Sequence, residues 1–297
     1  MNVSMSSDVV IVGSGVMGAA TAYWLTRLQP GLKVTLIESD TRYEKASSSL
    51  SASSIRQQFT CPVNIRLSQY GIAFLRKAEQ HLGMPDHPVA LGLQEPGYLY
   101  LAQADQVDAL QTAHQIQKQA GADVALLTPE AMRQRYPWLN VDDVVLGSLG
   151  LSGEGWFDGP ALHQAFLKKA MAQGVQRLHD RVVGMDHTAT HITGVRLASG
   201  GSLHCGQLVN AAGAWGGEVA AMAGVQRQHQ LAGRREVGRL ETVQNQGVLP
   251  LHRQLARVGH LHGQRGPAQT GICARFKRDQ WGEGRTGFLC CPGHEIG

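Results

Sequence analysis

The sequence has few cysteines and no long uninterrupted apolar run. These two absences argue against a disulfide-rich secreted protein and against a membrane-spanning one. Its five cysteines are an odd number, with neither the spacing of a zinc site nor a disulfide framework, which favours a reducing compartment. No stretch reaches the roughly 20 apolar residues that span a bilayer. The apolar N-terminal stretch lacks the basic flank of a signal peptide, and glycines interrupt it. These absences predict a soluble, cytoplasmic protein, with the mitochondrial matrix as the alternative for a eukaryotic source.

Several catalytic and binding signatures are also missing. There is no Ser-His-Asp arrangement and no group of residues with metal-ligand spacing, so we expect no metal site. The formal net charge is +4, yet through Val225 there are 16 Lys and Arg against 18 Asp and Glu, whereas from Gln226 onward there are 11 against 5. The basic excess therefore belongs to the last quarter, and we expect no nucleic-acid binding by the part before it.

What the sequence does contain is a dinucleotide-binding pattern near its start. An apolar run at residues 8–12 predicts a strand, and a Gly-x-Gly-x-x-Gly motif made of Gly13, Gly15 and Gly18 follows it. An Ala-rich stretch then predicts a helix as far as Arg27. In such a motif the first glycine permits the tight turn, the second lets the backbone approach a pyrophosphate, and the third lets the helix pack closely on the sheet. Free N–H groups at the start of the helix bind the phosphates.

Two further features support this interpretation. Glu38 ends a second apolar run at 34–37, twenty residues after Gly18, where a carboxylate bonds a ribose 2′-hydroxyl and disfavours a 2′-phosphate. Far along the chain, a predicted strand at 202–210 runs into the small residues of 211–214, a second place where backbone can approach a cofactor closely.

A serine-rich loop at 46–54 leads into Ile-Arg-Gln-Gln-Phe at 55–59. Its small residues allow a bulky group to come close, so we interpret it as a loop that faces the cofactor, with a flexible linker as the alternative. The remaining predicted helices are 64–82, 105–120, a short one that Thr128 caps, 161–173 and 218–223, and the remaining strands are 97–102, 181–185 and 191–197.

In this order, the glycine motif with Glu38, the serine-rich loop with 55–59, Gly-Trp-Phe-Asp at 155–158 and Asn-Ala-Ala-Gly-Ala-Trp at 210–215 resemble the D-amino-acid oxidase-like FAD-dependent oxidoreductases. That superfamily oxidises glycine, sarcosine and dimethylglycine. The resemblance implies FAD rather than NAD, because the turn at 210–215 belongs to flavin binding in the family. It implies an α/β fold with a discontinuous Rossmann-like FAD-binding domain at 1–90 and 150–225 and a smaller α+β substrate domain that begins with 91–149.

The resemblance also implies site residues. Those that would hold FAD are Gly13, Gly15, Val16, Met17, Gly18, Glu38, Ser47, Ser48, Ser49, Val182, Ala212, Gly213 and Trp215. The reaction would oxidise the C–N bond of a small amino acid or N-methyl amino acid by hydride transfer to the flavin. Arg56 is the candidate catalytic residue, a guanidinium for the substrate carboxylate, with a loop-anchoring salt bridge as the alternative. Residues 45–59 contain no histidine, so we expect no covalent flavin attachment there.

The resemblance falters after Val225. Residues 226–269 lose the apolar periodicity, and only 274–278 and 287–290 look like a strand pair of the substrate domain. We interpret residues 226–297 as an anomalous basic tail from a shifted reading frame that truncates the family pattern, with a native partner-binding tail as the alternative. The alternatives for function are a non-catalytic flavin-binding or assembly protein, an inactive truncated enzyme, and an NAD-dependent dehydrogenase.

Overall fold

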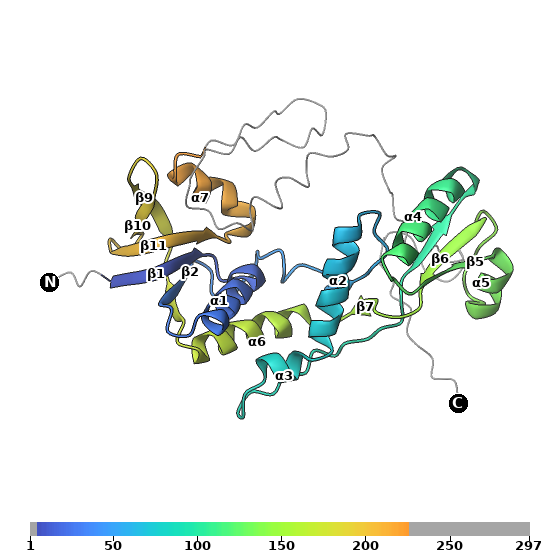
Figure 1. The fold of residues 1–297 in the computed structure, drawn as a ribbon, viewed down its shortest axis with the longest axis horizontal. Helices are drawn as coiled ribbons and strands as arrows, with labels where there is room; N and C mark the ends of the chain where they lie inside the picture. Colours follow the sequence, from blue (N-terminus) through green and yellow to red (C-terminus); the bar gives the residue numbers. More distant parts are fainter. Residues whose placement is uncertain (1–4, 226–297) are drawn as a thin grey trace. The chain divides into compact units, whose positions relative to one another are not determined.

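The computed structural model describes residues 5–225, and their contacts divide them into two compact units (Figure 1). The first unit comprises residues 5–51, 84–87 and 160–225, and the second comprises 52–83 and 88–159. Within residues 5–225, none of the helices combines the length and the hydropathy that a bilayer crossing requires.

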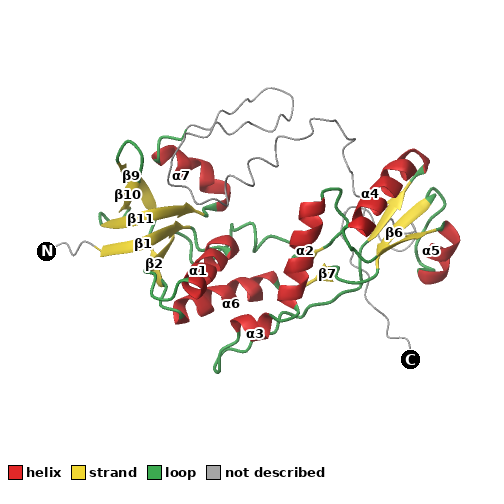
Figure 2. Ribbon diagram, viewed as in Figure 1, coloured by secondary structure: helices red, strands yellow, loops and turns green. Residues whose placement is uncertain are grey.

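The first unit is built on a six-stranded sheet (Figure 2). Its strands are β1 (Met5–Val12), β2 (Val34–Glu38), β8 (Gln176–His179), β9 (Val182–His187), β10 (Ile192–Leu197) and β11 (Ser202–Asn210). In the order β8-β2-β1-β11-β10-β9, the first four strands are parallel to one another, and β10 runs antiparallel to both β11 and β9. A parallel core centred on the first strand of the chain is the arrangement of a Rossmann-like α/β fold, as predicted.

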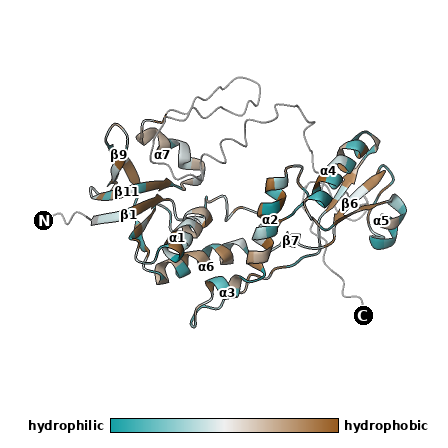
Figure 3. Cartoon of the chain, viewed as in Figure 1, coloured by the Kyte–Doolittle hydropathy of each residue, from teal (hydrophilic) through white to brown (hydrophobic). Residues whose placement is uncertain are grey.

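Helices cover both faces of this sheet. Helices α1 (Val16–Leu28) and α6 (Gly159–Ala172) lie on one side, and α7 (Gly216–Met222), which follows the short helix η2 (Gly213–Trp215), lies on the other (Figure 2). Tyr23 of α1 meets Phe166 of α6 edge to face, with ring centroids 5.4 Å apart. Val10 and Val12 of β1 pack in one cluster with Val219 of α7. Burial on both faces explains the continuous apolar run at residues 9–12, the second half of β1, which is brown in Figure 3.

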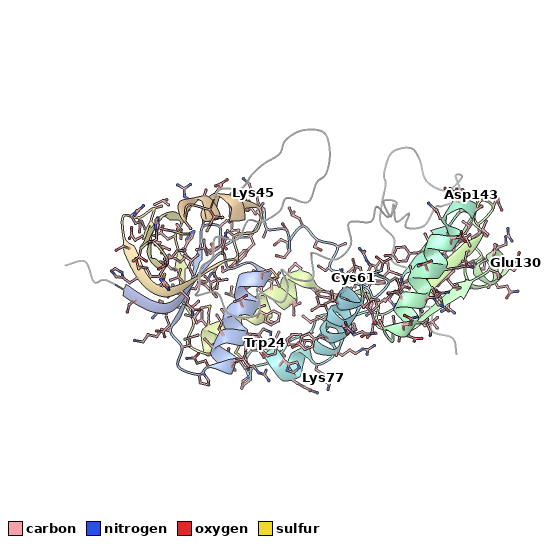
Figure 4. The ribbon with its side chains drawn as sticks, turned by 45° about the horizontal axis from the view of Figure 1, so that its top comes forward. Trp24, Lys45, Cys61, Lys77, Glu130 and Asp143 are labelled. Carbon is pink, nitrogen blue, oxygen red and sulfur yellow. The ribbon has the colours of Figure 1, made fainter. Side chains whose placement is uncertain are left out.

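The second unit is an α+β unit with a three-stranded antiparallel sheet in the order β4-β6-β5. Its strands are β4 (Leu99–Ala102), β5 (Val124–Leu127) and β6 (Leu146–Gly150), and β3 (Ser54–Ile55) pairs separately with β7 (Gly155–Trp156). Its helices are α2 (Pro62–Leu75), α3 (Ala78–Leu82), η1 (Ala104–Gln106), α4 (Val107–Gln119) and α5 (Pro129–Arg135). Figure 4 labels Cys61, the residue before α2, and Glu130 in the first turn of α5.

The limits of the compact units differ from those of the predicted domains. Residues 52–83 belong with the second unit rather than the first, and the chain returns to the first unit at residue 160 rather than 150. The physical reason is that β3 pairs with β7, and Ile65 of α2 is buried against Ala122 and Val124. The assignment of FAD binding and substrate binding to separate domains stays a prediction.

Most predicted elements are present with shifted ends. The predicted helix 64–82 is interrupted because Lys77 leaves the helical conformation, with φ −114° and ψ 19°. Thr128 caps α5 as predicted, since its hydroxyl accepts the Ala131 N–H at 3.3 Å. The sequence pattern does not predict β5, β6 or β8. The predicted strand pair at 274–278 and 287–290, like the whole tail from residue 226, lies outside the described residues.

Candidate cofactor site

The glycine motif forms the turn between β1 and α1. Gly13 has φ +96°, a conformation that disfavours any side chain, and a Cβ there would lie 2.5 Å from the Ala211 carbonyl oxygen. A Cβ on Gly18 would lie 1.9 Å from the Gly13 carbonyl oxygen. A Cβ on Gly15, in contrast, would meet nothing within 4 Å. The first and third glycines are therefore required by packing within the turn, whereas the second borders open space.

The beginning of α1 is open to an anion. No side chain caps the helix, and its first turn contains no acidic residue. Its first residues include Met17, whose side chain is 71% exposed. The N–H groups of the first turn and the positive end of the helix dipole are therefore available to a phosphate. Together with the open space at Gly15, this arrangement fits a dinucleotide pyrophosphate.

Glu38 lies at the end of β2, beside this turn. Its carboxylate accepts the Ser14 N–H at 2.8 Å and the Asp40 N–H at 2.9 Å, and its side chain is partly exposed. An ionised carboxylate has about four acceptor positions, so it retains capacity for a ribose hydroxyl. The structure brings Glu38 and the glycine motif together as predicted, while the role of Glu38 toward a ribose stays a prediction.

Ser14 is supported by three side chains that the sequence pattern does not identify. Two of them contact Ser14, and the third acts through Tyr43. His163 of α6 donates from Nε2 to the Ser14 carbonyl oxygen at 2.8 Å. The Tyr43 hydroxyl lies 2.6 Å from the Ser14 hydroxyl and accepts a hydrogen bond from Arg177 at 2.9 Å. Burial raises the pKa of Tyr43, so the phenol stays protonated and can donate to Ser14. His163 therefore holds the backbone of the turn, and Tyr43, itself bonded to Arg177, holds the Ser14 side chain.

His163 makes the stability of the first unit depend on pH. Burial lowers its pKa below 6.5, its ordinary value, with the Ser14 hydrogen bond partly opposing the shift. As the pH falls, the unfolded chain binds this proton before the folded chain does, so the contribution of His163 to the unfolding free energy is present above about pH 6.5 and is lost as the pH falls through its folded-state pKa. We expect the unfolding free energy to decrease from pH 7.5 to 5.5, and to decrease less in His163→Gln.

Urea unfolding at both pH values measures this difference. His114→Gln serves as the comparison. His114 lies in the second unit, and burial lowers its pKa as it lowers that of His163. A pH dependence in His163→Gln equal to that of the unchanged protein would contradict the assignment.

The second predicted turn lies directly beside the glycine motif. Strand β11 pairs with β1 so that Asn210 is opposite Val12, and the Ala211 N–H donates to the Val12 carbonyl oxygen at 2.8 Å. The Asn210 side chain fixes the turn, accepting the Ala212 N–H at 3.2 Å and donating to the Gly216 carbonyl oxygen at 2.7 Å. Gly213 has φ +56° and borders open space. The structure therefore brings Ala212 and Gly213 next to the end of β1, with Trp215 45% exposed.

The other predicted cofactor positions also lie in the first unit. Ser47 and Ser49 are exposed and Ser48 is half-buried in the loop that Lys45 begins (Figure 4). Val182 has a buried side chain at the start of β9, so only its backbone can face a ligand. The chain just before it is bonded to β2, since the Asp180 N–H donates to the Glu38 carbonyl oxygen at 3.0 Å.

Arg56 belongs to the second unit. Its side chain is exposed, with Cζ 5.6 Å from the centroid of the Phe59 ring. No ion pair found within residues 5–225 includes Arg56, so the salt-bridge alternative has no support in that part of the chain. The catalytic role of Arg56 stays a prediction.

The first unit thus has the fold and the glycine turn of the Rossmann-like dinucleotide-binding proteins. Residues 8–266 match the DAO family, described as FAD dependent oxidoreductase. The chain belongs to this family, and FAD is therefore its cofactor.

Individual relatives agree with this assignment. The chain is 37% identical over 241 residues to FAD-dependent oxidoreductase domain-containing protein 1 of Xenopus laevis, a match that covers 74% of this chain and 48% of the relative. It is 26% identical over 227 residues to the mitochondrial sarcosine dehydrogenase of Homo sapiens, covering 74% of this chain and 24% of that protein. Among solved structures, L-proline dehydrogenase from P. horikoshii superposes with a TM-score of 0.67 at 27% identity, covering 76% of this chain and 58% of that one. The chain spans about half the length of FAD-dependent oxidoreductase domain-containing protein 1 of Xenopus laevis, Bos taurus and Mus musculus.

Proposed function

We propose that the protein is an FAD-dependent oxidoreductase that oxidises the C–N bond of a small amino acid or N-methyl amino acid. The observation that supports this most is the open glycine turn at Gly15, next to the turn at Ala212 and Gly213, in a chain that matches the FAD-dependent family over residues 8–266. The names of the relatives support the substrate class, since one is a sarcosine dehydrogenase and another an L-proline dehydrogenase.

Each candidate residue has a physical task in this proposal. The first-turn N–H groups of α1, including those of Val16 and Met17, bind the pyrophosphate, and Glu38 accepts a hydrogen bond from the adenosine ribose. Ser47, Ser48 and Ser49 line the cofactor without occupying its space, as does the backbone at Ala212, Gly213 and Val182. When bound, FAD supplies the acceptor for the hydride that leaves the carbon next to the substrate nitrogen.

The visible absorption spectrum of the purified protein tests this proposal. We expect flavin bands, and we expect them to bleach under anaerobic conditions when sarcosine, glycine, proline or a D-amino acid is added. Bands that persist with every amine would leave a flavin-binding protein and overturn the proposed reaction. A protein that shows no bands, even after incubation with FAD, would overturn the cofactor role of these residues.

Arg56 gives a prediction about the substrate. If its guanidinium binds the substrate carboxylate, Arg56→Ala should raise KM by roughly 10- to 100-fold, the effect of losing a charge-assisted hydrogen-bonded pair, with a smaller change in kcat. Anaerobic flavin reduction at several concentrations of the amine separates the two constants. Arg66→Ala is the matched control, since Arg66 is also an exposed arginine of the second unit. An Arg56→Ala protein with the KM of Arg66→Ala would contradict the role.

A further inference from the structure

The second unit contains a carboxylate that is completely buried. Glu154, between β6 and β7, is 0% exposed. Its Oε1 accepts the backbone N–H groups of Gln57 at 2.6 Å and Gln58 at 3.1 Å, and its Oε2 accepts the Gln58 side-chain amide at 2.9 Å and the Tyr98 N–H at 3.2 Å. Neutral amide donors therefore satisfy the whole carboxylate. Among residues 5–225, no ion pair includes Glu154.

Such a group is costly to bury. Burial raises the pKa of Glu154, and the four hydrogen bonds only oppose that shift. The surrounding chain is shaped to admit the carboxylate, because a Cβ on Gly150 would lie 1.9 Å from Oε2. Gly153 has φ +71°, and a Cβ there would lie 2.2 Å from the Gln57 side-chain nitrogen. The loop at 150–155 is therefore built around Glu154 and Gln57 together.

The segment that Glu154 holds is the one that carries Arg56. On one side of Arg56, Ile55 pairs with Gly155 in the β3-β7 ladder. On the other side, the bond from the Gln57 N–H to Oε1 fixes the Arg56–Gln57 peptide group. The Gln58 side chain extends the anchor, since it donates to the Tyr98 carbonyl oxygen at 2.8 Å and accepts the Ser148 hydroxyl at 2.7 Å.

Buried anchors thus flank an exposed cation. Gln57 and Gln58 are 6% and 8% exposed, whereas the Arg56 side chain reaches the surface over the Phe59 ring. Fixing the backbone before a ligand arrives reduces the conformational entropy that is lost on binding. The same guanidinium therefore binds an anion more tightly.

We propose that Glu154 is a positioning residue, which fixes the Arg56–Gln57 and Gln57–Gln58 peptide groups so that the Arg56 guanidinium is presented to the carboxylate of the substrate. This inference rests on the proposed function, which assigns the substrate carboxylate to Arg56. Glu154 itself is buried and acts only through the 55–58 segment.

Replacing Glu154 by glutamine tests the inference with little change in volume. The new amide group places a donor opposite either the Gln57 and Gln58 backbone N–H groups or the Gln58 amide and Tyr98 N–H, so one pair of donors loses its acceptor. Reorienting the Gln58 amide does not resolve this, because its oxygen would then face the Tyr98 carbonyl oxygen. In either orientation the 57–58 segment loses a bond that holds it, through its backbone or through the Gln58 side chain, so we expect this segment to become more mobile.

The measurement is the affinity of the flavin-loaded full chain for acetate, followed through the flavin spectrum, with acetamide as the uncharged probe. In Glu154→Gln we expect acetate to bind about tenfold more weakly and acetamide to bind unchanged, as for one weakened charge-assisted contact. In an Arg56→Ala background, Glu154→Gln should have no further effect on acetate. Hydrogen exchange at the Gln57 and Gln58 amides should accelerate, a readout that requires no flavin.

Glu95→Gln is the matched control. Glu95 contacts the same loop, accepting the Gly153 N–H at 2.9 Å, and forms an ion pair with Arg76, but none of its hydrogen bonds reaches residues 55–58. It should leave acetate binding unchanged. If Glu154→Gln fails to fold, Ser148→Ala releases the Gln58 amide more gently and should shift acetate affinity in the same direction.

The outcomes separate the two proposals. A flavin-loaded wild-type protein that binds neither acetate nor any of the amino acids would overturn the proposed function, and the inference with it. A wild-type protein that binds acetate, while Glu154→Gln binds it equally well or weakens it further in the Arg56→Ala background, would overturn the inference alone.

Discussion

Replacing Gly18 by alanine is expected to abolish flavin retention and to destabilise the first unit. The added Cβ would lie 1.9 Å from the carbonyl oxygen of Gly13, and because that atom is backbone, the whole turn between β1 and α1 must move. Overpacking of this kind costs about 1–3 kcal/mol or more. The displaced turn no longer offers its N–H groups to the pyrophosphate, so we expect the flavin content of the purified protein to fall to a small fraction of that of the unchanged protein.

Two comparison variants make the result specific. Gly15→Ala meets no atom of the folded chain within 4 Å, so its unfolding free energy should be unchanged while its methyl group occupies the space left for the pyrophosphate and flavin is lost. Gly201→Ala, near the turn between β10 and β11, has no neighbour closer than 3.7 Å and should retain both flavin and stability. Flavin absorbance and urea unfolding measure the two properties. A Gly15→Ala protein that keeps its flavin would contradict the proposed pyrophosphate position.

Replacing Glu154 by alanine is expected to give the largest loss of stability in the second unit. Unlike glutamine, alanine removes both acceptor oxygens, so the N–H groups of Gln57, Gln58 and Tyr98 lose their acceptor in a buried space, and the Gln58 amide keeps only its bond to the Tyr98 carbonyl oxygen. Orphaned buried donors cost about 1–3 kcal/mol each, and partial relaxation brings the total to about 3–5 kcal/mol. Urea unfolding monitored by circular dichroism measures the loss.

Glu130→Ala provides the reference for this experiment. Glu130 is an exposed acid of α5 in the same unit, and its removal should leave the unfolding transition almost where it was. If Glu154→Ala had the same urea midpoint as Glu130→Ala, water would have to replace all four contacts. Glu154 would then make no net contribution to the unfolding free energy.

The parts of the site that could be predicted from the sequence are those with a local pattern. Gly13, Gly15, Gly18 and Glu38 lie within one strand-helix-strand segment, where apolar runs and glycine spacing reveal both the fold and the chemistry. The turn at 210–215 could be predicted because a strand ends there in small residues. These elements are present where the sequence places them.

The remainder depends on contacts between distant residues. His163 meets Ser14 across 149 positions, and Glu154 meets Gln57 across 97, so no window along the chain shows either pair. Strand β8 is polar and only partly buried, which hides the alternation that marks a strand. The two-residue strands β3 and β7 are too short for any periodicity, and they are what assign 52–55 to the second unit.

The position of β11 in the sheet also affects how the protein is made. Strand β1 pairs on one side with β2, which follows after a single helix, but on the other side with β11, with Val12 opposite Asn210. A ribosome that adds about 5–20 residues per second therefore exposes one hydrogen-bonding edge of β1 for roughly 10–40 s before its partner emerges. An open apolar edge is a surface on which nascent chains aggregate or recruit chaperones, so we expect slower translation between β2 and β11 to lengthen this exposure.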